Sequence, residues 1–327
     1  SEVLLTQTSD RTEIVLEGLF SPVERGLAMA KKWGEQGVLE LSDPAGMNSL
    51  FIPLLEAYPQ VSSMMVANQD GYEWMLLKTD TGWTNRVTRA DEWGTQAKWY
   101  EWDHEGNAVS ENWRETEYDP RGRPWFTQAI ETTEDGELAW TDPYTFFTTK
   151  DPGITASTKW KSIESATLEH VVGFDVLLLD ISRFTTSYEF GDRGRAVVFG
   201  EDGRIIGLPA RSGFEGTELL KSNVLKTGEE LGLPVIEDAL QLWTIERPTR
   251  PVAFKSDSEK WWGAFRPSHL SNQTFWIGIF VPSIEFTADA DRRLAIVFLT
   301  AAISILLAFL IAARLARTYS RPLEKLA

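Results

Sequence analysis

The sequence predicts an α+β protein with a long N-terminal helix, two stacked antiparallel-sheet modules and then one transmembrane α-helix. Apolar residues recur at helical spacing near the start of the chain. An order of hairpin, helix and further strands occurs twice in the middle, and an uninterrupted apolar run lies near the end. With 327 residues, of which 43% are hydrophobic, the chain can bury a sizeable core in one large or two ordinary domains.

Residues 1–45 are expected to hold the long helix. Its apolar positions are spaced as on one face of a helix, namely Leu16, Leu19, Phe20, Val23 and Leu27. Pro22 lies inside this pattern, and Ser21 with Glu24 can form a capping box. A kink or a helix restart is therefore predicted at this proline.

Residues 46–188 are expected to form the first module. A second helix is predicted over residues 47–58, and a short helix over residues 123–132. Alternating apolar residues and Asp-Gly turns predict strands in the remaining stretches, at 61–80, 84–93, 98–109, 140–149, 153–162 and 170–181. Asp180 is then expected to be a turn partner at the end of the last strand.

Residues 189–288 are expected to form the second, smaller module. Residues 194–209 read as a hairpin around an Asp-Gly turn, and residues 216–228 as a helix. Two paired strands are predicted at 260–270 and 273–283, with residues 286–293 continuing as a helix. No long linker separates the two modules, so we expect them to stack and to share the long helix.

Residues 289–315 are expected to form the transmembrane helix. Residues 294–313 contain no charge, proline or glycine, and at 1.5 Å per residue they span roughly 30 Å, the thickness of a bilayer core. A buried core helix is the alternative, but few soluble helices are apolar on every face over this length. Four cations follow the run, Arg314, Arg317, Arg321 and Lys325. The positive-inside rule therefore predicts a cytoplasmic C-terminus, with residues 1 to about 290 outside.

The composition excludes several classes of function. The formal net charge of −16 disfavours nucleic-acid binding, which requires a basic surface. The absence of cysteine excludes disulfides, thiol nucleophiles and cysteine zinc sites. Three histidines without HExxH spacing argue against metal-assisted hydrolysis, and no GxSxG elbow is present. We therefore expect no metal, no cofactor and no catalytic residues in this fragment.

One segment identifies a family resemblance. YDPRGRPWF, residues 118–126, combines two proline-fixed turns with two arginines and an aromatic pair. Together with WTDPY at 140–144, GFDVLLLDIS at 173–182 and AVVFGEDGRIIG at 196–207, it resembles the double Cache (dCache) extracellular sensor domain of bacterial transmembrane receptors. The resemblance implies two PAS-like Cache modules. The tail TYSRPLEKLA, within residues 316–327, is similar to the start of a cytoplasmic HAMP relay.

The residues of the motif suit a small anionic ligand. Arg123 offers a planar fork of donors for a carboxylate, and Trp125 can form an apolar wall. The resemblance implies that Arg123 and Trp125 bind the ligand carboxylate, that Tyr144 contacts the ligand, and that Asp175 holds an ammonium group. Arg121 and Arg123 could instead pair with Asp119 and fix the turn, a reading we favour for Arg121.

Two departures from the family pattern predict a less polar pocket. Phe126 replaces the usual tyrosine, and Phe146 stands where some amino-acid binders place another acid. Both are included among the candidate ligand-binding residues. A carboxylate-bearing ligand is favoured, while an amine or a more aromatic ligand stays open.

The resemblance implies a bacterial inner-membrane receptor with a periplasmic sensor, a small-molecule ligand and a homodimeric assembly. The signalling output, as in chemotaxis or two-component sensing, is expected to follow the HAMP-like segment. The alternatives are the ectodomain of a receptor cyclase, phosphatase or histidine kinase with another ligand class, and a membrane-tethered ectodomain that binds a protein. An exported hydrolase is disfavoured because no catalytic constellation is recognisable.

Overall fold

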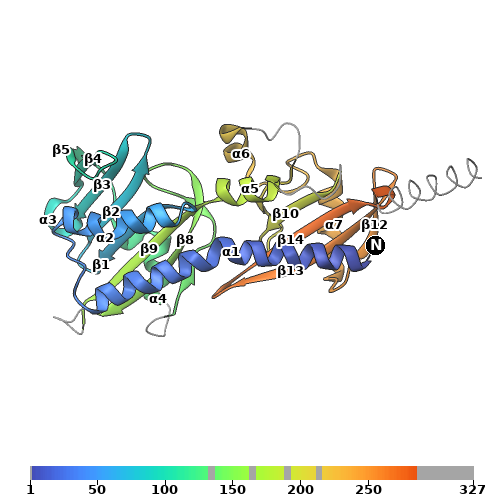
Figure 1. Cartoon of the computed structure of the whole chain (residues 1–327), viewed down its shortest axis with the longest axis horizontal. Helices are drawn as coiled ribbons and strands as arrows, with labels where there is room; N and C mark the ends of the chain where they lie inside the picture. The colour runs from blue at the N-terminus through green and yellow to red at the C-terminus, as the bar shows by residue number, and fades with distance from the viewer. Residues whose placement is uncertain (1, 132–136, 162–166, 188–192, 211–215, 286–327) are drawn as a thin grey trace, which may run out of the picture.

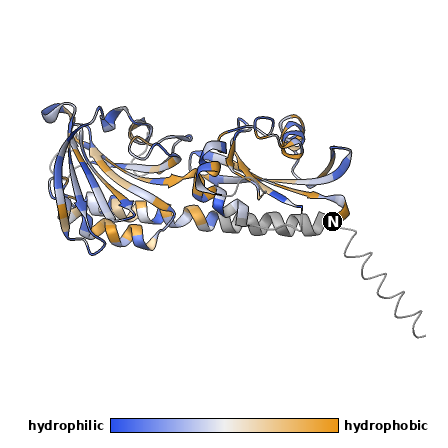
Figure 2. Ribbon diagram, turned by 90° about the horizontal axis from the view of Figure 1, so that it is seen from above, coloured by the Kyte–Doolittle hydropathy of each residue, from blue (hydrophilic) through white to orange (hydrophobic). Residues whose placement is uncertain are grey.

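The computed structural model describes residues 2–131, 137–161, 167–187, 193–210 and 216–285, with side chains of the first helix described from Glu17 onward. Two antiparallel sheets lie one after the other along the long axis, and α1 (Glu2–Glu35) runs along both (Figure 1). The predicted combination of helices with two antiparallel sheets is therefore confirmed. Hydrophobic residues concentrate along the central strands, whereas turns and the outer strands of the first sheet are hydrophilic (Figure 2).

Helix α1 packs along strands of both sheets. Phe20, Val23, Leu27 and Ala30 are fully buried, as their spacing on one helical face predicts. Pro22 lies inside the helix, which continues to Glu35, so the predicted restart is wrong. The burial of apolar residues on both sides of the proline stabilises the helix against the loss of one backbone hydrogen bond.

The first sheet has nine strands in the order β5-β4-β3-β2-β1-β9-β8-β6, with β7 paired to β8, and all of its pairings are antiparallel. Helix α2 begins after Asp43, whose side chain accepts a hydrogen bond from the Gly46 amide. Pro44 occupies the first turn of the helix, where proline is favoured. The elements of this part are α2 (Pro44–Ala57), β1 (Val61–Asn68), β2 (Tyr72–Thr79), β3 (Gly82–Arg89), α3 (Ala90–Trp93), β4 (Gln96–Trp102), β5 (Ala108–Glu115), the 3-10 helix η1 (Pro120–Gly122), α4 (Pro124–Glu131), β6 (Ala139–Trp140), β7 (Tyr144–Thr145), β8 (Pro152–Lys161) and β9 (Glu169–Leu177).

The two faces of the first sheet have different coverings. Met64 on β1 belongs to the main core beneath α1 and α2, whereas its neighbour Met65 belongs to a second cluster on the opposite face. Trp125 and Phe126 from α4 complete that second cluster. The alternation of side chains along the strands thus places the YDPRGRPWF segment on the face that α1 does not cover.

The second sheet has five strands in the order β11-β10-β14-β13-β12. Its buried residues belong to the same core cluster as those of the first module, and α1 packs on strands of both sheets. The elements here are α5 (Leu178–Ser187), β10 (Arg195–Phe199), β11 (Ile205–Gly207), α6 (Thr217–Asn223), α7 (Pro234–Glu246), β12 (Val252–Ser256), β13 (Glu259–Leu270) and β14 (Gln273–Pro282).

Several predicted elements differ from the structure. Residues 140–149 contain only the last residue of β6 and the two-residue strand β7, because Pro143 cannot donate to a strand ladder. The strand predicted over 170–181 ends at Leu177, and Asp180 lies in the first turn of α5, where it pairs with Arg183. The predicted helix over 216–228 ends at Asn223, and the sequence reading missed α7 and β12.

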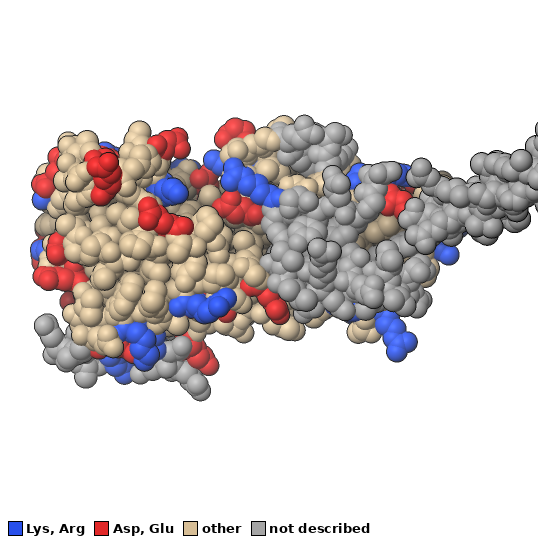
Figure 3. All heavy atoms as spheres, viewed as in Figure 1, with Lys and Arg blue, Asp and Glu red and all other residues tan. Residues whose placement is uncertain are grey.

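Among the described residues, no helix has the length and apolar character needed to cross a membrane. The predicted span at 294–313, the helical lead over 286–293 and the HAMP-like tail lie outside the described residues. On the face shown in Figure 3, lysine and arginine side chains are dispersed among acidic ones, without a continuous basic stripe on the described part of that face.

Candidate functional site

The YDPRGRPWF segment positions Arg123 between two short helical elements. Asp119 caps η1 by accepting a hydrogen bond from the Arg121 amide, and Pro124 begins α4. Arg123 itself has extended backbone angles, with φ −91° and ψ 144°. The prolines therefore fix the point from which the Arg123 side chain leaves the backbone.

Arg121 belongs to a surface ion-pair network. Its guanidinium lies 2.8 Å from an Asp119 oxygen and 2.9 Å from an Asp91 oxygen. This arrangement fits the structural role that the sequence favours for Arg121.

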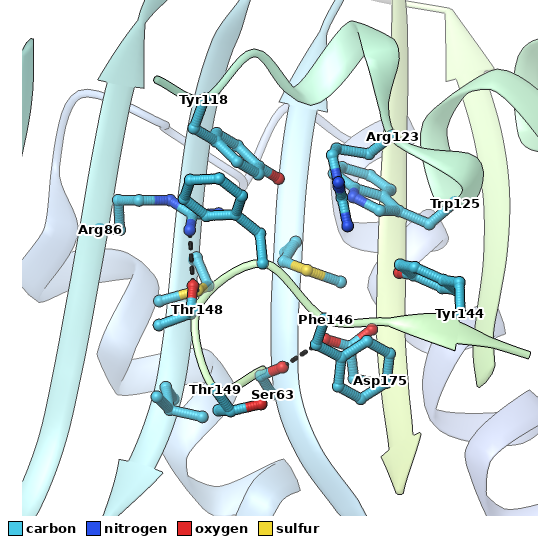
Figure 4. A pocket seen from close by; sticks show the side chains of 14 residues that line it. Ser63, Arg86, Tyr118, Arg123, Trp125, Tyr144, Phe146, Thr148, Thr149 and Asp175 are labelled. Atoms are coloured by element: carbon cyan, nitrogen blue, oxygen red, sulfur yellow. Dashed lines mark hydrogen bonds between the residues drawn. The ribbon is translucent and has the colours of Figure 1, made fainter. Parts of the chain in front are cut away.

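A narrow cavity opens on the face of the first sheet that α1 does not cover (Figure 4). Its free volume of about 20 Å³ has room for about one water molecule. Five of the six candidate residues line it: Arg123, Trp125, Tyr144, Phe146 and Asp175. They come from α4, β7, β9 and the connections next to them, so residues more than 50 positions apart in sequence converge here.

Phe126 does not line the cavity, contrary to its inclusion among the candidates. It is buried in the second cluster and packs edge to face against Trp125, with ring centroids 5.7 Å apart. Because consecutive residues of a helix point in different directions, Trp125 and Phe126 cannot both face the same narrow cavity from α4.

Asp175 lies on β9 at the floor of the cavity and is 4% exposed. Its two oxygens accept hydrogen bonds from the hydroxyls of Ser63 and Thr155, each at 2.6 Å. Burial raises the pKa of the Asp175 carboxyl to about 6, although the two hydroxyls and the nearby guanidinium groups lower it. A buried carboxylate without a cationic partner costs folding free energy, which is typical of a functional position.

Tyr144 extends this hydrogen-bonded group. Its hydroxyl lies 2.7 Å from Thr155 Oγ1, and burial raises the pKa of the phenol so that it stays protonated. Phe146 follows two residues later and packs on Gly153, where a Cβ atom would collide with the Phe146 ring. The glycine on β8 is thus needed to let the phenylalanine reach the cavity.

Arg86 on β3 is a buried cation that the sequence reading missed. Its guanidinium forms two hydrogen bonds with Glu73, at 2.8 and 3.0 Å, and donates a third to Thr148 Oγ1 at 2.6 Å. The Tyr118 hydroxyl also donates to Glu73 at 2.8 Å, and the Tyr118 ring lies 3.6 Å from the guanidinium carbon. The charge of Arg86 is therefore balanced within the protein.

Arg123 differs from Arg86 because no described carboxylate lies within ion-pair distance of it. It donates one hydrogen bond, to the Thr145 carbonyl at 3.0 Å, and its guanidinium lies 5.5 Å from the Tyr144 ring. Its remaining donors and its charge stay available to a ligand.

The remaining lining residues were also not singled out from the sequence: Ser63, Met65, Met75, Leu77, Tyr118, Phe147, Thr148 and Thr149. Arg86 had a detectable signal, because it and Glu73 are opposite charges within the consecutive predicted strand regions 84–93 and 61–80. Only the observed register, which pairs Met75 with Arg86, shows that both point to the cavity face.

Larger clefts lie elsewhere on the described part of the chain, with volumes of about 560, 580 and 440 Å³. The cationic residues in the first two, Arg89 and Arg204, are paired with Glu92 and Asp202, and no lysine or arginine lines the third. Among the described residues, no group of three or more histidine, aspartate or glutamate side chains is placed to hold a metal ion. The narrow cavity is therefore the candidate site, because opposite charges converge there without partners.

No known family model matches the sequence. The fold is similar to the ligand-binding domain of the Pseudomonas aeruginosa PAO1 amino-acid chemoreceptor PctB in complex with L-Arg, with a TM-score of 0.56 and 18% identity, covering 90% of this chain and 93% of that one. It is also similar to the ligand-binding domain of the Pseudomonas fluorescens chemoreceptor CtaA in complex with L-isoleucine, with a TM-score of 0.53 and 17% identity over 87% and 93% of the chains. A third neighbour is the ligand-binding domain of the Pseudomonas aeruginosa PAO1 chemoreceptor PctC in complex with GABA, with a TM-score of 0.52 and 15% identity over 86% and 99%. These likenesses show a shared fold.

Proposed function

We propose that this chain is the small-molecule-sensing region of a transmembrane receptor and that its cavity binds an amino-acid-like ligand carrying both a carboxylate and an ammonium group. The observation that carries the proposal is the pair of unmatched opposite charges, Arg123 and Asp175, that line one cavity. A zwitterion matches both charges at once, whereas a simple carboxylate or a simple amine leaves one of them without a partner.

The charge balance of the cavity supports this ligand class. Arg86 and Glu73 neutralise each other, so they add no net charge for the ligand to match. Arg123 would hold the carboxylate through its free donors, and Asp175 with the Tyr144 hydroxyl would hold the ammonium group. The fold neighbours named above were solved with L-Arg, L-isoleucine and GABA, and each of these ligands carries both a carboxylate and an ammonium group.

The rest of the lining favours a ligand with an apolar side chain. Met65, Met75 and Leu77 come from the sheet, and Phe146 and Phe147 from the connection after β7. Methionine and aromatic side chains adapt to ligand shape and offer large apolar surfaces. We therefore rank apolar amino acids above acidic ones as ligands.

The cavity must enlarge when a ligand enters. A volume of about 20 Å³ holds about one water and is far below that of an amino acid. The segment that crosses in front of the strands in Figure 4 carries Phe146, Thr148 and Thr149, and its displacement would open the site. Ligand binding would then shift the population between a closed and an open arrangement, which is what a sensor requires.

A thermal-shift panel on the protein tests the proposal. The panel should contain apolar, acidic and basic L-amino acids, 4-aminobutyrate, simple carboxylates and simple amines. Stabilisation by at least one zwitterion and by no simple carboxylate or amine is expected. Stabilisation only by a simple carboxylate, or by none of the compounds, would contradict the proposed ligand class.

Arg123→Ala should weaken binding of the stabilising compound by roughly ten- to a hundredfold, because a charge-assisted contact worth about 1.5–3 kcal/mol is lost. The fold should persist, since Arg123 donates a single hydrogen bond to the described residues. Calorimetric titration measures the affinity. Arg121→Ala is the matched control, because it removes an arginine of the same motif that lies outside the cavity and forms ion pairs with the surface residues Asp91 and Asp119. Unchanged affinity in Arg123→Ala would make the arginine a scaffold residue.

We further propose the placement in the membrane: residues 46–188 and 189–288 as the two sensing modules outside the inner membrane, residues 289–315 as the span and residues 316–327 in the cytoplasm. Four cations after residue 313 support this orientation. The complete receptor would be a homodimer, since parallel relay helices require partners. A reporter enzyme that works only in the cytoplasm should be active when it is fused after Ala327, and a reporter that works only outside the cytoplasm should be inactive there. Protease access to that end from outside intact cells would overturn the orientation.

A further inference from the structure

We infer that residues 140–151, which form one wall of the candidate cavity, are bonded at both ends to side chains of the second module and report the state of the cavity to that module. We call these two sets of bonds the two grips. The inference rests on the proposed function only for the role of the ligand. The grip itself is a property of the ligand-free protein.

Asn272 provides the first grip. It lies in the turn between β13 and β14 of the second module, and its side chain bonds both backbone groups of Trp140. The Asn272 oxygen accepts from the Trp140 amide at 2.6 Å, and its amide group donates to the Trp140 carbonyl at 3.1 Å. Trp140 already pairs with Ala156 on β8, so Asn272 takes the place of a further strand residue at this edge of the first sheet.

The neighbouring contacts strengthen this junction. Gln273 donates to Asp142 at 3.1 Å. The Trp140 indole donates to Glu24 of α1 at 3.0 Å and packs edge to face on Phe20, with centroids 5.3 Å apart. Trp140 thus joins the first sheet, α1 and the tip of the second sheet at one point.

Lys221 provides the second grip. It lies on α6 of the second module, and its ammonium is 2.8 Å from an Asp151 oxygen. Asp151 precedes β8, and its carbonyl accepts from the Phe146 amide at 2.9 Å. The ion pair is partly shielded, with the side chains 29% and 18% exposed. Asp151 therefore connects the second module directly to the turn that carries Phe146.

The stretch between the two grips contacts the cavity. Arg123 donates to the Thr145 carbonyl and Arg86 to the Thr148 hydroxyl, while Phe146 and Phe147 fill the space between them. A ligand too large for the closed cavity must displace this stretch. Because both ends are bonded to the second module, the displacement must be shared with that module or must break one of the grips.

Amide hydrogen exchange on the ligand-free protein tests the inference. The reporters are the Phe146 and Lys150 amides, which bond to the carbonyls of Asp151 and Phe146. Lys221→Met should raise their opening about two- to fivefold, as expected for a partly exposed ion pair. Asn272→Ala should raise it by about tenfold, because the Trp140 amide loses its acceptor and the Trp140 carbonyl keeps only the Gln128 side chain of its two described side-chain donors. Asn272→Asp, which keeps the acceptor and loses the donor, should give a smaller rise.

Lys226→Met is the matched control, because Lys226 bonds to Asn223 within the second module. It should leave the two reporter amides unchanged. Unchanged exchange in both grip variants would overturn the inference, as would an equal rise at the Phe174 amide of β9, which would indicate global destabilisation. The exchange measurement needs no ligand. It can therefore support the inference even if no compound of the thermal-shift panel stabilises the protein.

Discussion

Replacing Arg86 with methionine should lower the free energy of unfolding by about 3–5 kcal/mol, the largest stability effect that we expect from any residue of the cavity. Both partners of the Arg86–Glu73 pair are almost completely buried, with side chains 1% and 0% exposed. Without the guanidinium, the Glu73 carboxylate keeps only the Tyr118 hydroxyl as a charge-stabilising side-chain donor. An uncompensated buried charge is far more costly than a lost surface pair.

Chemical denaturation of the variant at neutral pH measures this loss. Arg114→Met is the control, because Arg114 pairs with Glu101 at a distance of 3.2 Å but is 48% exposed, so a loss of at most about 1 kcal/mol is expected. Adding Glu73→Gln to Arg86→Met should recover part of the stability, because it removes the unpaired buried charge of the Glu73 carboxylate. A single variant no less stable than the Arg114 control would show that water or another cation reaches Glu73.

Asp175→Asn should have opposite effects on folding and on binding. At pH 8 we expect the ligand-free variant to be more stable than the parent by roughly 2–3 kcal/mol, because burial raises the pKa of Asp175 from 3.8 to about 6 and the charged form is disfavoured in the fold. Binding of a zwitterion should fall more than a hundredfold, since the ammonium group loses its counter-charge. Asp180→Asn, at a carboxylate outside the cavity, should leave the affinity unchanged.

The pH dependence of both effects has a defined sign. Below about pH 4 the carboxyl is protonated in the folded and the unfolded chain, so the variant and the parent should have equal stability. Between pH 4 and pH 6 only the unfolded chain loses the proton, and the parent should lose stability as the pH rises. Affinity of the parent for a zwitterion should conversely decline below pH 6. Denaturation and titration series over this range measure both, and a stability difference that persists at pH 3.5 would contradict the carboxylate as its cause.

The sequence contained enough to name five of the residues that line the candidate site, but not the other nine. The spacing of Phe20, Val23 and Leu27 predicted the buried face of α1, and the prolines around Arg123 predicted a fixed turn. Arg86 was not predicted as a site residue, because the face of the sheet to which its side chain points depends on the register of β2 and β3. That register is set by packing between strands. The first turn of helix α5 was predicted as strand because a short apolar run such as residues 176–181 does not distinguish the two states.

Residues 140–149 show why the sequence overpredicted strand. Threonine, tyrosine and phenylalanine favour strands, yet only short pieces pair with β8 before and after Pro143. The rest of the segment turns across the cavity, where Phe146 is buried and Phe147 is half-buried without strand pairing. Local propensity identified the apolar content of the segment, whereas its backbone path follows from tertiary contacts.

The shared helix α1 has a consequence for how the chain can be divided. The apolar side of α1 fills the core of the first module, while other parts of the same helix pack on β13 and β14 of the second. The sequence boundary near residue 188 therefore separates two sheets without separating two folding units. A fragment of residues 46–188 would expose the surface that Phe20, Val23 and Leu27 cover, so each sheet depends on a segment of chain that precedes both.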